Sequence, residues 1–131
     1  MSYIKHKSEE SMEDYLETIL HLYRKNGHVR SIDIANELAF TKASVSIAMK
    51  SLREKELITV DETGYISLTE EGMKKANKVL ERHTLLSDWL IRLGVSEKTA
   101  IEDACRIEHD ISDETFEILK KHCFVSKKTR Q

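Results

Sequence analysis

The 131-residue sequence contains no proline, only four glycines and two cysteines, and 6% aromatic residues. The absence of proline, together with 40% hydrophobic and 34% charged residues, is typical of a helix-rich soluble protein. Cys105 and Cys123 do not make a disulfide framework, so a reducing cytosol is the expected location. No apolar run is long enough to span a membrane, and the first residues, MSYIKHKSEESMEDY, lack the hydrophobic region of a signal peptide.

The sequence also lacks a strong charge of either sign, with a formal net charge of −2. Residues 1–70 carry nine Lys and Arg against twelve Asp and Glu, a net charge of −3, whereas residues 71–131 carry twelve against eleven, a net charge of +1. A DNA-binding surface in the first half would therefore have to be a local basic patch. The length allows one compact domain or two small ones that share a core.

Hydrophobic periodicity predicts three helices in the first half, over residues 11–25, 31–39 and 43–55. The apolar period then changes to two residues, and the stretches LITV and YISL predict two strands joined by a four-residue turn that ends at Gly64. Two helices at a tight turn followed by a hairpin form a winged helix-turn-helix. We therefore expect a mainly α protein with a winged helix-turn-helix domain over residues 1–70.

The second half is predicted to be entirely helical. Thr69 is expected to cap a long helix that ends near Leu93. Two shorter helices and a frayed basic tail follow, over residues 96–109, 112–123 and 125–131. This part, residues 71–131, offers too small a core to be stable alone and is predicted to be half of a dimer interface.

The second helix of a helix-turn-helix pair enters the major groove, and its N-terminal residues reach base edges. The corresponding residues here are mostly small, hydroxyl-bearing or basic: Thr41, Lys42, Ala43, Ser44, Ser46, Ile47, Lys50 and Arg53. Small residues let the backbone approach the groove, hydroxyls can bind phosphates or bases, and cations neutralise phosphates. A solvent-facing helix with ordinary charges would look the same on this segment alone, but the hairpin behind it favours DNA binding.

The stretch CRIEHD places a thiol, a carboxylate and an imidazole on one helical turn, because Cys105, Glu108 and His109 stand at i, i+3 and i+4. Periodicity predicts an inward face made of Ile101, Ala104, Cys105 and Glu108. An unpaired carboxylate on such a face is costly, and this donor set suits a first-row transition ion. Spacing alone leaves two alternatives open: Cys105 as a small buried hydrophobe, and His109 as a solvated helix end.

Three further residues are less clear from periodicity. His83 stands inside the apolar stripe of the long helix, where a core histidine with satisfied hydrogen bonds is the usual outcome. Asp14 and Glu17 stand at i and i+3 on the first helix, on the side predicted to face solvent. Periodicity alone does not make them metal ligands.

The stretches SMEDYLETI, ERHTLL and CRIEHDIS, in this order around the winged helix, resemble the diphtheria toxin repressor family of metal-dependent transcriptional regulators. The resemblance covers roughly residues 8–122. It implies that the all-helical part is a dimerisation domain and that metal is shared between the two domains. It also implies a primary site of Asp14, Cys105, Glu108 and His109, and a neighbouring position that uses Glu17 and His83, with one or two ions per subunit.

Features of two family branches meet in this sequence. The manganese-responsive branch has an aspartate where Asp14 stands and usually a glutamate where Cys105 stands, whereas the iron-responsive branch has methionine and cysteine there. The chain stops at residue 131, without the SH3-like third domain of the iron branch, and Ser87 and Ile101 stand where that branch has further ligands. We therefore expect Mn²⁺ as the cofactor, with Fe²⁺ second because of the thiolate.

The resemblance implies a cytoplasmic homodimer that binds a double-stranded DNA operator and represses metal-uptake genes when the ion is plentiful. It implies no membrane partner, no organic ligand and no enzymatic activity. One alternative is a winged-helix regulator that ignores metals and leaves Asp14, Glu17 and His109 without an ion. Another is a metalloenzyme, for which the sequence offers no substrate-binding motif.

Overall fold

The structure, a computed structural model, describes the backbone of residues 2–124 and the side chains of residues 11–123. The chain forms two compact units, Met1–Asn77 and Lys78–Gln131. The predicted basic tail, residues 125–131, lies outside the described residues. Helices make up most of the described backbone, which also contains one two-stranded sheet. This composition confirms the predicted mainly α class.

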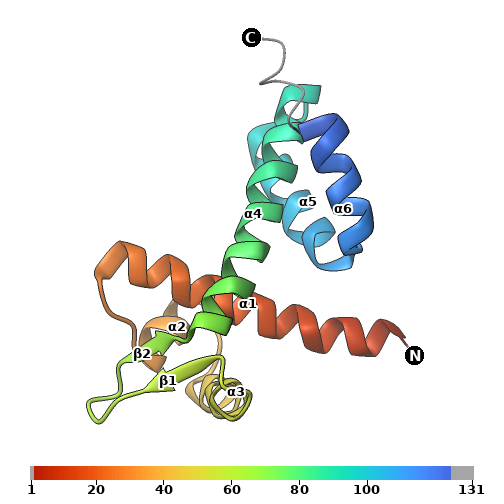
Figure 1. Ribbon diagram of the computed structural model, residues 1–131. Coiled ribbons are helices and arrows are strands. Elements are labelled where there is room, and N and C mark those ends of the chain that lie inside the picture. The colour runs from red at the N-terminus through yellow and green to blue at the C-terminus, as the bar shows by residue number, and fades with distance from the viewer. Residues whose placement is uncertain (1, 125–131) are drawn as a thin grey trace. The chain divides into compact units, whose positions relative to one another are not determined.

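The first unit is a winged helix-turn-helix (Figure 1). Its described elements are α1 (Ser2–Asn26), α2 (Ser31–Leu38), α3 (Lys42–Glu54), β1 (Ile58–Val60) and β2 (Ile66–Leu68). α1 contacts α2, α3 and β2, and the spacing of its buried residues Leu16, Ile19 and Leu20 gives the apolar face that those elements cover. The predicted order of helices and strands is confirmed.

The wing is an antiparallel hairpin in which Ile58 pairs with Leu68 and Val60 pairs with Ile66. The Asp61 carboxylate organises its turn, because Oδ1 accepts from the backbone N–H groups of Thr63 and Tyr65 at 2.9 Å and from the Thr63 hydroxyl at 2.8 Å. These bonds, that of the Thr63 hydroxyl first, lower the pKa of Asp61. The connection thus extends to Tyr65, one residue beyond the predicted four-residue turn.

The helix after the wing, α4 (Glu70–Leu93), begins in the first unit. Thr69 Oγ1 accepts from the N–H of Gly72 at 3.0 Å and donates to the carbonyl of Glu56 at 2.8 Å, which confirms the predicted cap. A Cβ at Gly72 would lie 2.0 Å from the carbonyl oxygen of Leu57. Glycine is therefore needed where the first turn of α4 meets the backbone that leads into β1.

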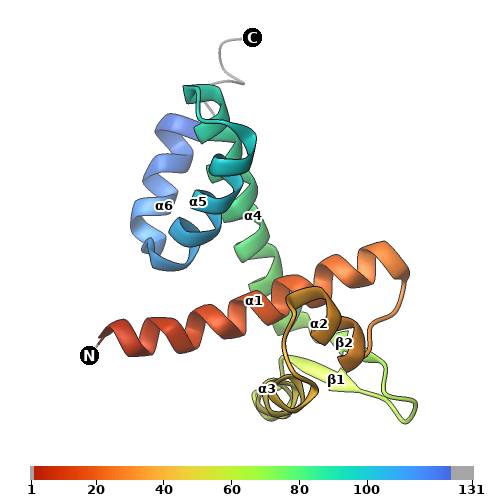
Figure 2. The same ribbon diagram turned by 180° about the vertical axis from the view of Figure 1, so that it is seen from behind.

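The second unit consists of the rest of α4, α5 (Glu97–Asp110), α6 (Asp113–Leu119) and a π-helical turn, η1 (Lys120–Phe124). α4, α5 and α6 lie side by side in both views (Figures 1 and 2). Each contributes one residue to a small buried cluster of Leu86, Ala104 and Phe116. The two predicted short helices are present, and the second changes to a π-helix at Lys120.

Candidate metal centre and nucleic-acid interface

Helix α3 presents one buried and one exposed face. Val45, Met49 and Leu52 are buried, at the i, i+4 and i+7 spacing of a single helical face. All eight residues that the sequence predicts for DNA contact are exposed: Thr41, Lys42, Ala43, Ser44, Ser46, Ile47, Lys50 and Arg53. The exposed face of α3 can therefore be approached by DNA without disturbing the core of the first unit.

Thr41 and Ser44 have a structural role at the start of α3. Thr41 Oγ1 accepts from the backbone N–H of Ser44 at 3.1 Å, and its hydroxyl donates to Ser44 Oγ at 2.9 Å. These contacts form a side-chain N-cap, which fixes the first turn of the helix. Lys42 is the first residue of α3 and directly follows the cap, so the cap also fixes the backbone at Lys42.

A second polar group lies beside the wing, and the sequence predictions did not include it. The guanidinium of Arg30 lies 4.5 Å from the centre of the Tyr65 ring, and the ring of His28 lies 5.2 Å from it. Buried Val29, between His28 and Arg30, accepts a hydrogen bond from the N–H of Ile66 at 2.7 Å. The sequence signal for this group was the polar, apolar, polar alternation of His28, Val29 and Arg30. In an extended segment, this alternation places the two polar side chains on the same side of the backbone.

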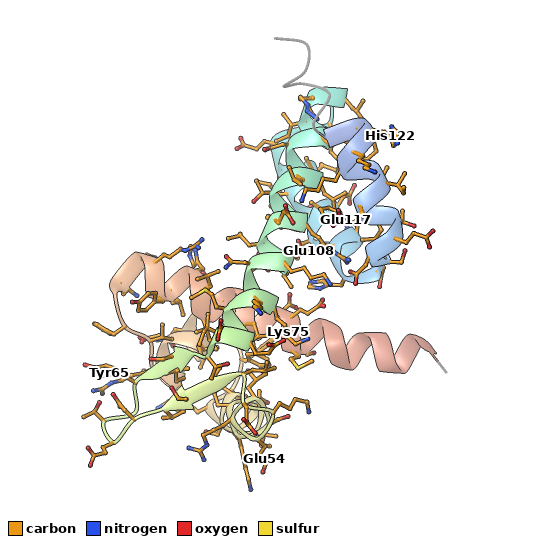
Figure 3. The ribbon with its side chains drawn as sticks, viewed as in Figure 1. Glu54, Tyr65, Lys75, Glu108, Glu117 and His122 are labelled. Carbon is orange, nitrogen blue, oxygen red and sulfur yellow. The ribbon has the colours of Figure 1, made fainter. Side chains whose placement is uncertain are left out.

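In the second unit, four predicted metal ligands come together. Side-chain donor atoms of Cys105, Glu108 and His109, all on α5, lie within 4.8 Å of one another. His83 on α4 approaches the same carboxylate, with Nδ1 3.2 Å from Glu108 Oε2, and His109 Nε2 lies 3.5 Å from Oε1. Glu108, labelled in Figure 3, is thus the shared member of the group.

These distances fit a transition metal ion. Two atoms that bind one ion at about 2.0–2.3 Å can be at most about 4.6 Å apart, so small side-chain rotations would suffice. The Glu108 side chain is 0% exposed and that of His109 is 1% exposed. A buried carboxylate beside two imidazoles and a thiol is chemically suited to a divalent cation, because the cation compensates the buried negative charge.

The burial of α5 corrects parts of the sequence prediction. Ala104 and Glu108 are buried as predicted, but Ile101 and Cys105 are exposed. Cys105 is therefore not a small buried hydrophobe, and His109, whose side chain is buried, is not a solvated helix end. The buried line is Ala100, Ala104 and Glu108, spaced four residues apart, so the centre of the inward face is rotated by about 50°, roughly a seventh of a turn, from the predicted face.

Arg82 supports this cluster and was missed by the sequence predictions. Its Nη1 donates to the backbone carbonyls of Glu108 at 3.0 Å and Ile111 at 2.8 Å, and Nη2 pairs with Asp113 Oδ1. The side chain is 8% exposed and occupies the buried side of α4 between Val79 and Leu86. An arginine at an apolar-stripe position was the sequence signal. Arg82 holds the C-terminal end of α5, where Glu108 is located.

His83 is held by the regular backbone of α4. The hydroxyl of buried Ser87 donates to the carbonyl of His83 at 2.8 Å and lies 3.2 Å from that of Thr84. Ser87 thus serves its own helix, as serine commonly does in helix interiors. Its hydroxyl is directed at the backbone of α4.

Asp14 and Glu17 lie one turn apart on α1, in the first unit, and both are partly exposed. They flank the buried pair Tyr15 and Leu16. Burial, and then the adjacent Asp14 carboxylate, raise the pKa of Tyr15. Neither acidic residue is fully solvated, which differs from the prediction from periodicity.

Comparisons with known proteins agree with this geometry. Residues 7–65 match the model of the iron dependent repressor N-terminal DNA binding domain, and residues 69–126 match that of the iron dependent repressor metal binding and dimerisation domain. An uncharacterized HTH-type transcriptional regulator of Methanocaldococcus jannaschii is 36% identical over 113 residues, which are 85% of this chain and 90% of that protein. The chain belongs to the family of metal-dependent transcriptional repressors.

Two further relatives extend the comparison. The transcriptional regulator MntR of Escherichia coli O6:H1 is 35% identical over 111 residues, which are 85% of this chain and 72% of that protein. The structure of the manganese regulator SloR superimposes with a TM-score of 0.74 at 28% identity, covering 84% of this chain. The chain spans only 52% of SloR.

Family membership assigns a DNA-binding domain followed by a domain that binds metal and dimerises. The chain therefore binds DNA and a divalent metal ion, and it forms a dimer with a second copy of itself. None of the described helices is long and apolar enough to cross a membrane.

Proposed function

We propose that this protein is a repressor whose operator binding is switched on by a divalent metal held by His83, Cys105, Glu108 and His109 together with Asp14 and Glu17 of α1. The buried Glu108 carboxylate, with imidazole nitrogens at 3.2 and 3.5 Å, is the observation that carries this proposal. The DNA-binding domain would comprise residues 1–70, and the metal-binding and dimerisation domain residues 71–131.

The metal supplies two things that the chain lacks. It neutralises carboxylate charge around Glu108, and it gives Asp14 and Glu17 a common partner with ligands of the second unit. In the metal-free protein, the carboxylates repel one another, and ordering the two domains for DNA binding costs conformational entropy. A shared ion reduces both, so less ordering entropy opposes DNA binding.

We propose Mn²⁺ as the physiological ion, with Fe²⁺ as the second choice and one or two ions per subunit. Carboxylates at Asp14, Glu17 and Glu108 favour manganese, whereas a Cys105 thiolate favours a softer ion such as iron, zinc or cobalt. The similarity to the manganese regulator SloR supports the same choice.

The dimer places two copies of α3 on one operator. Half-sites read by a symmetric dimer are spaced by about 34 Å, one turn of DNA. Large exposed apolar side chains of the second unit support an interface there: Ile91, Leu93, Ile101 and Ile118. The DNA contacts that we propose remain those of α3, from Thr41 to Arg53.

We propose that the output is repression of metal-uptake genes in the cytoplasm, where a transcriptional regulator meets its DNA, and that the protein has no catalytic role. The competing proposal is a winged-helix regulator that binds DNA without metal. The position of buried Glu108 between two histidines favours the metal-dependent form, because a bound cation would compensate the charge of the buried carboxylate.

A gel-shift titration separates these proposals. The probe is a duplex recovered from a random-sequence library by the manganese-loaded protein. Treatment with a chelator should abolish binding, and added Mn²⁺ should restore it. Equal binding with and without the chelator would contradict the metal-dependent proposal and favour the competing one.

A further inference from the structure

Ile47 is the residue of α3 whose exposure is hardest to explain by folding. Its side chain is 71% exposed, the largest value among the exposed large hydrophobic side chains of the described residues. It stands about 140° to 200° around the helix from each of the buried residues Val45, Met49 and Leu52, at about 100° per residue. Ile47 therefore points directly away from the core of its unit.

The surroundings of Ile47 do not form an apolar patch. Ala43 and Ser44, one turn earlier on the same face, are small, and Lys50 lies one turn later. Lys42 and Arg53 add positive charge towards the two ends of the helix. Protein-binding surfaces are usually contiguous apolar patches, which this face lacks. An isolated branched aliphatic side chain between cations instead suits a base edge between two phosphate backbones.

From this placement we infer that Ile47 reads the C5 methyl group of a thymine in the major groove. This inference rests on the proposed DNA-binding function and deepens it. The four base pairs present different groups in the major groove, and the thymine methyl is the apolar one. An aliphatic side chain cannot hydrogen-bond to a base, so its recognition must come from burying apolar surface.

The small neighbours make this contact possible. Side chains on a helix project beyond the backbone, and short residues at Ala43, Ser44 and Ser46 keep the surface around Ile47 low. Ile47, the sixth of the thirteen residues of α3, therefore projects beyond these short neighbours near the middle of the helix. Lys42 and Lys50, being longer and flexible, can reach outward to phosphates while Ile47 meets the base edge.

The test uses uracil, which differs from thymine only by the absent methyl group. The full-length manganese-loaded protein is first used to select duplexes from a random-sequence library. Each thymine of the selected duplex is then replaced in turn by deoxyuridine, and affinity is measured at fixed salt for wild type and Ile47→Ala. Ile32→Ala, which shortens an isoleucine 40% exposed on α2, is the matched control.

One thymine in each half-site should be sensitive. There, loss of the methyl should weaken wild-type binding roughly three- to tenfold, as expected for burial of one methyl group. Ile47→Ala should bind the thymine and uracil duplexes equally, and Ile32→Ala should behave as wild type. Ile47→Ala should also keep the salt dependence of binding and the melting temperature, because it removes no charge and no buried contact.

Two results would overturn the inference while leaving the proposed function intact: less than a twofold effect of every thymine-to-uracil change on wild type, or the same effect on Ile47→Ala. Failure of the manganese-loaded protein to select any DNA would instead overturn the proposed function, and the inference with it. The outcomes are distinguishable because only the last lacks metal-dependent DNA binding altogether.

Discussion

Helices α3 and α5 both carry polar residues at helical spacing, but these residues lie in opposite environments. On α3 the hydroxyls and cations from Thr41 to Arg53 are exposed, and the core face is apolar. On α5 the core face itself ends in a carboxylate, Glu108. Figure 3 labels an exposed and a buried carboxylate, Glu54 at the C-terminal end of α3 and Glu108 on α5.

The difference shows where structure adds most to sequence. An exposed polar residue costs little in either state, so its function has to be argued from its neighbours and from family membership. A buried carboxylate costs free energy unless something compensates it, and Glu108 beside two imidazoles is a group chemically suited to a cation. Substitutions on the two helices should therefore affect different quantities: DNA affinity for α3, and metal affinity and stability for α5.

The largest effect is expected at Glu108. Glu108→Gln keeps the shape of the side chain but removes the charge, so metal affinity should fall by more than about 100-fold and metal-dependent operator binding should be lost. Calorimetric titration with Mn²⁺ and a gel shift measure the two effects. Glu102→Gln, at an exposed position on the same helix, should leave both unchanged. Equal losses in the two variants would remove the distinction between buried and exposed carboxylates.

Arg82 is a buried cation of the second unit, and its removal should mainly lower stability. Arg82→Ala leaves the carbonyls of Glu108 and Ile111 without their donor, which should cost about 2–4 kcal/mol in the free energy of unfolding. Lys78→Ala removes an exposed partner of Asp113 and should cost less than about 1 kcal/mol. Urea denaturation of the metal-free proteins compares them. Similar losses would mean that burial does not set the contribution of these cations.

On α3 the expected effect is on DNA. Lys50→Ala should weaken binding to all sequences by a similar factor, and the slope of log affinity against log salt should fall by about one. Its free energy of unfolding should stay within about 0.5 kcal/mol of wild type, because the side chain is exposed. Lys98→Ala, exposed on α5, is the control and should leave DNA binding unchanged. A loss of stability without a change in salt slope would contradict a phosphate contact.

The smallest effect is expected at Asp61, an exposed carboxylate that contrasts with Glu108. Because the folded-state pKa of Asp61 is below its ordinary 3.8, its charge stabilises the wing above about pH 4, and this contribution is lost as the pH falls through the folded-state pKa. Asp61→Asn should therefore melt below wild type at pH 7, and the gap should shrink in acid. Glu62→Gln is the neighbouring exposed control. A gap that is constant with pH would contradict the linkage.

Local patterns were enough to predict most of the fold. The change of period from 3.6 to two residues located the wing, and Thr69 was recognised as a cap from its residue type and place. Gly72 could not be interpreted in this way. Its need for glycine comes from the carbonyl of Leu57, which the sequence places 15 residues earlier and which the fold brings to the first turn of α4.

The candidate site was only partly predictable. The i, i+3, i+4 spacing of Cys105, Glu108 and His109 indicated the cluster, and the family resemblance added His83. Periodicity misjudged the burial of Ile101 and Cys105, because the buried line of α5 consists of two small alanines and a carboxylate, which hydrophobicity marks only weakly. The role of Arg82 depends on carbonyls 26 and 29 residues further along, and no local pattern contains that information.

The most direct test of the metal centre is the melting temperature of the chelator-treated protein, without DNA, as Mn²⁺ is added. Binding to the native state alone at 100 times the dissociation constant adds about 2.7 kcal/mol of stability, so the wild-type midpoint should rise by roughly 10 °C, and that of Glu108→Gln should not move. A wild-type midpoint that is the same in Mn²⁺ and in chelator would contradict the assignment of a cation to these side chains.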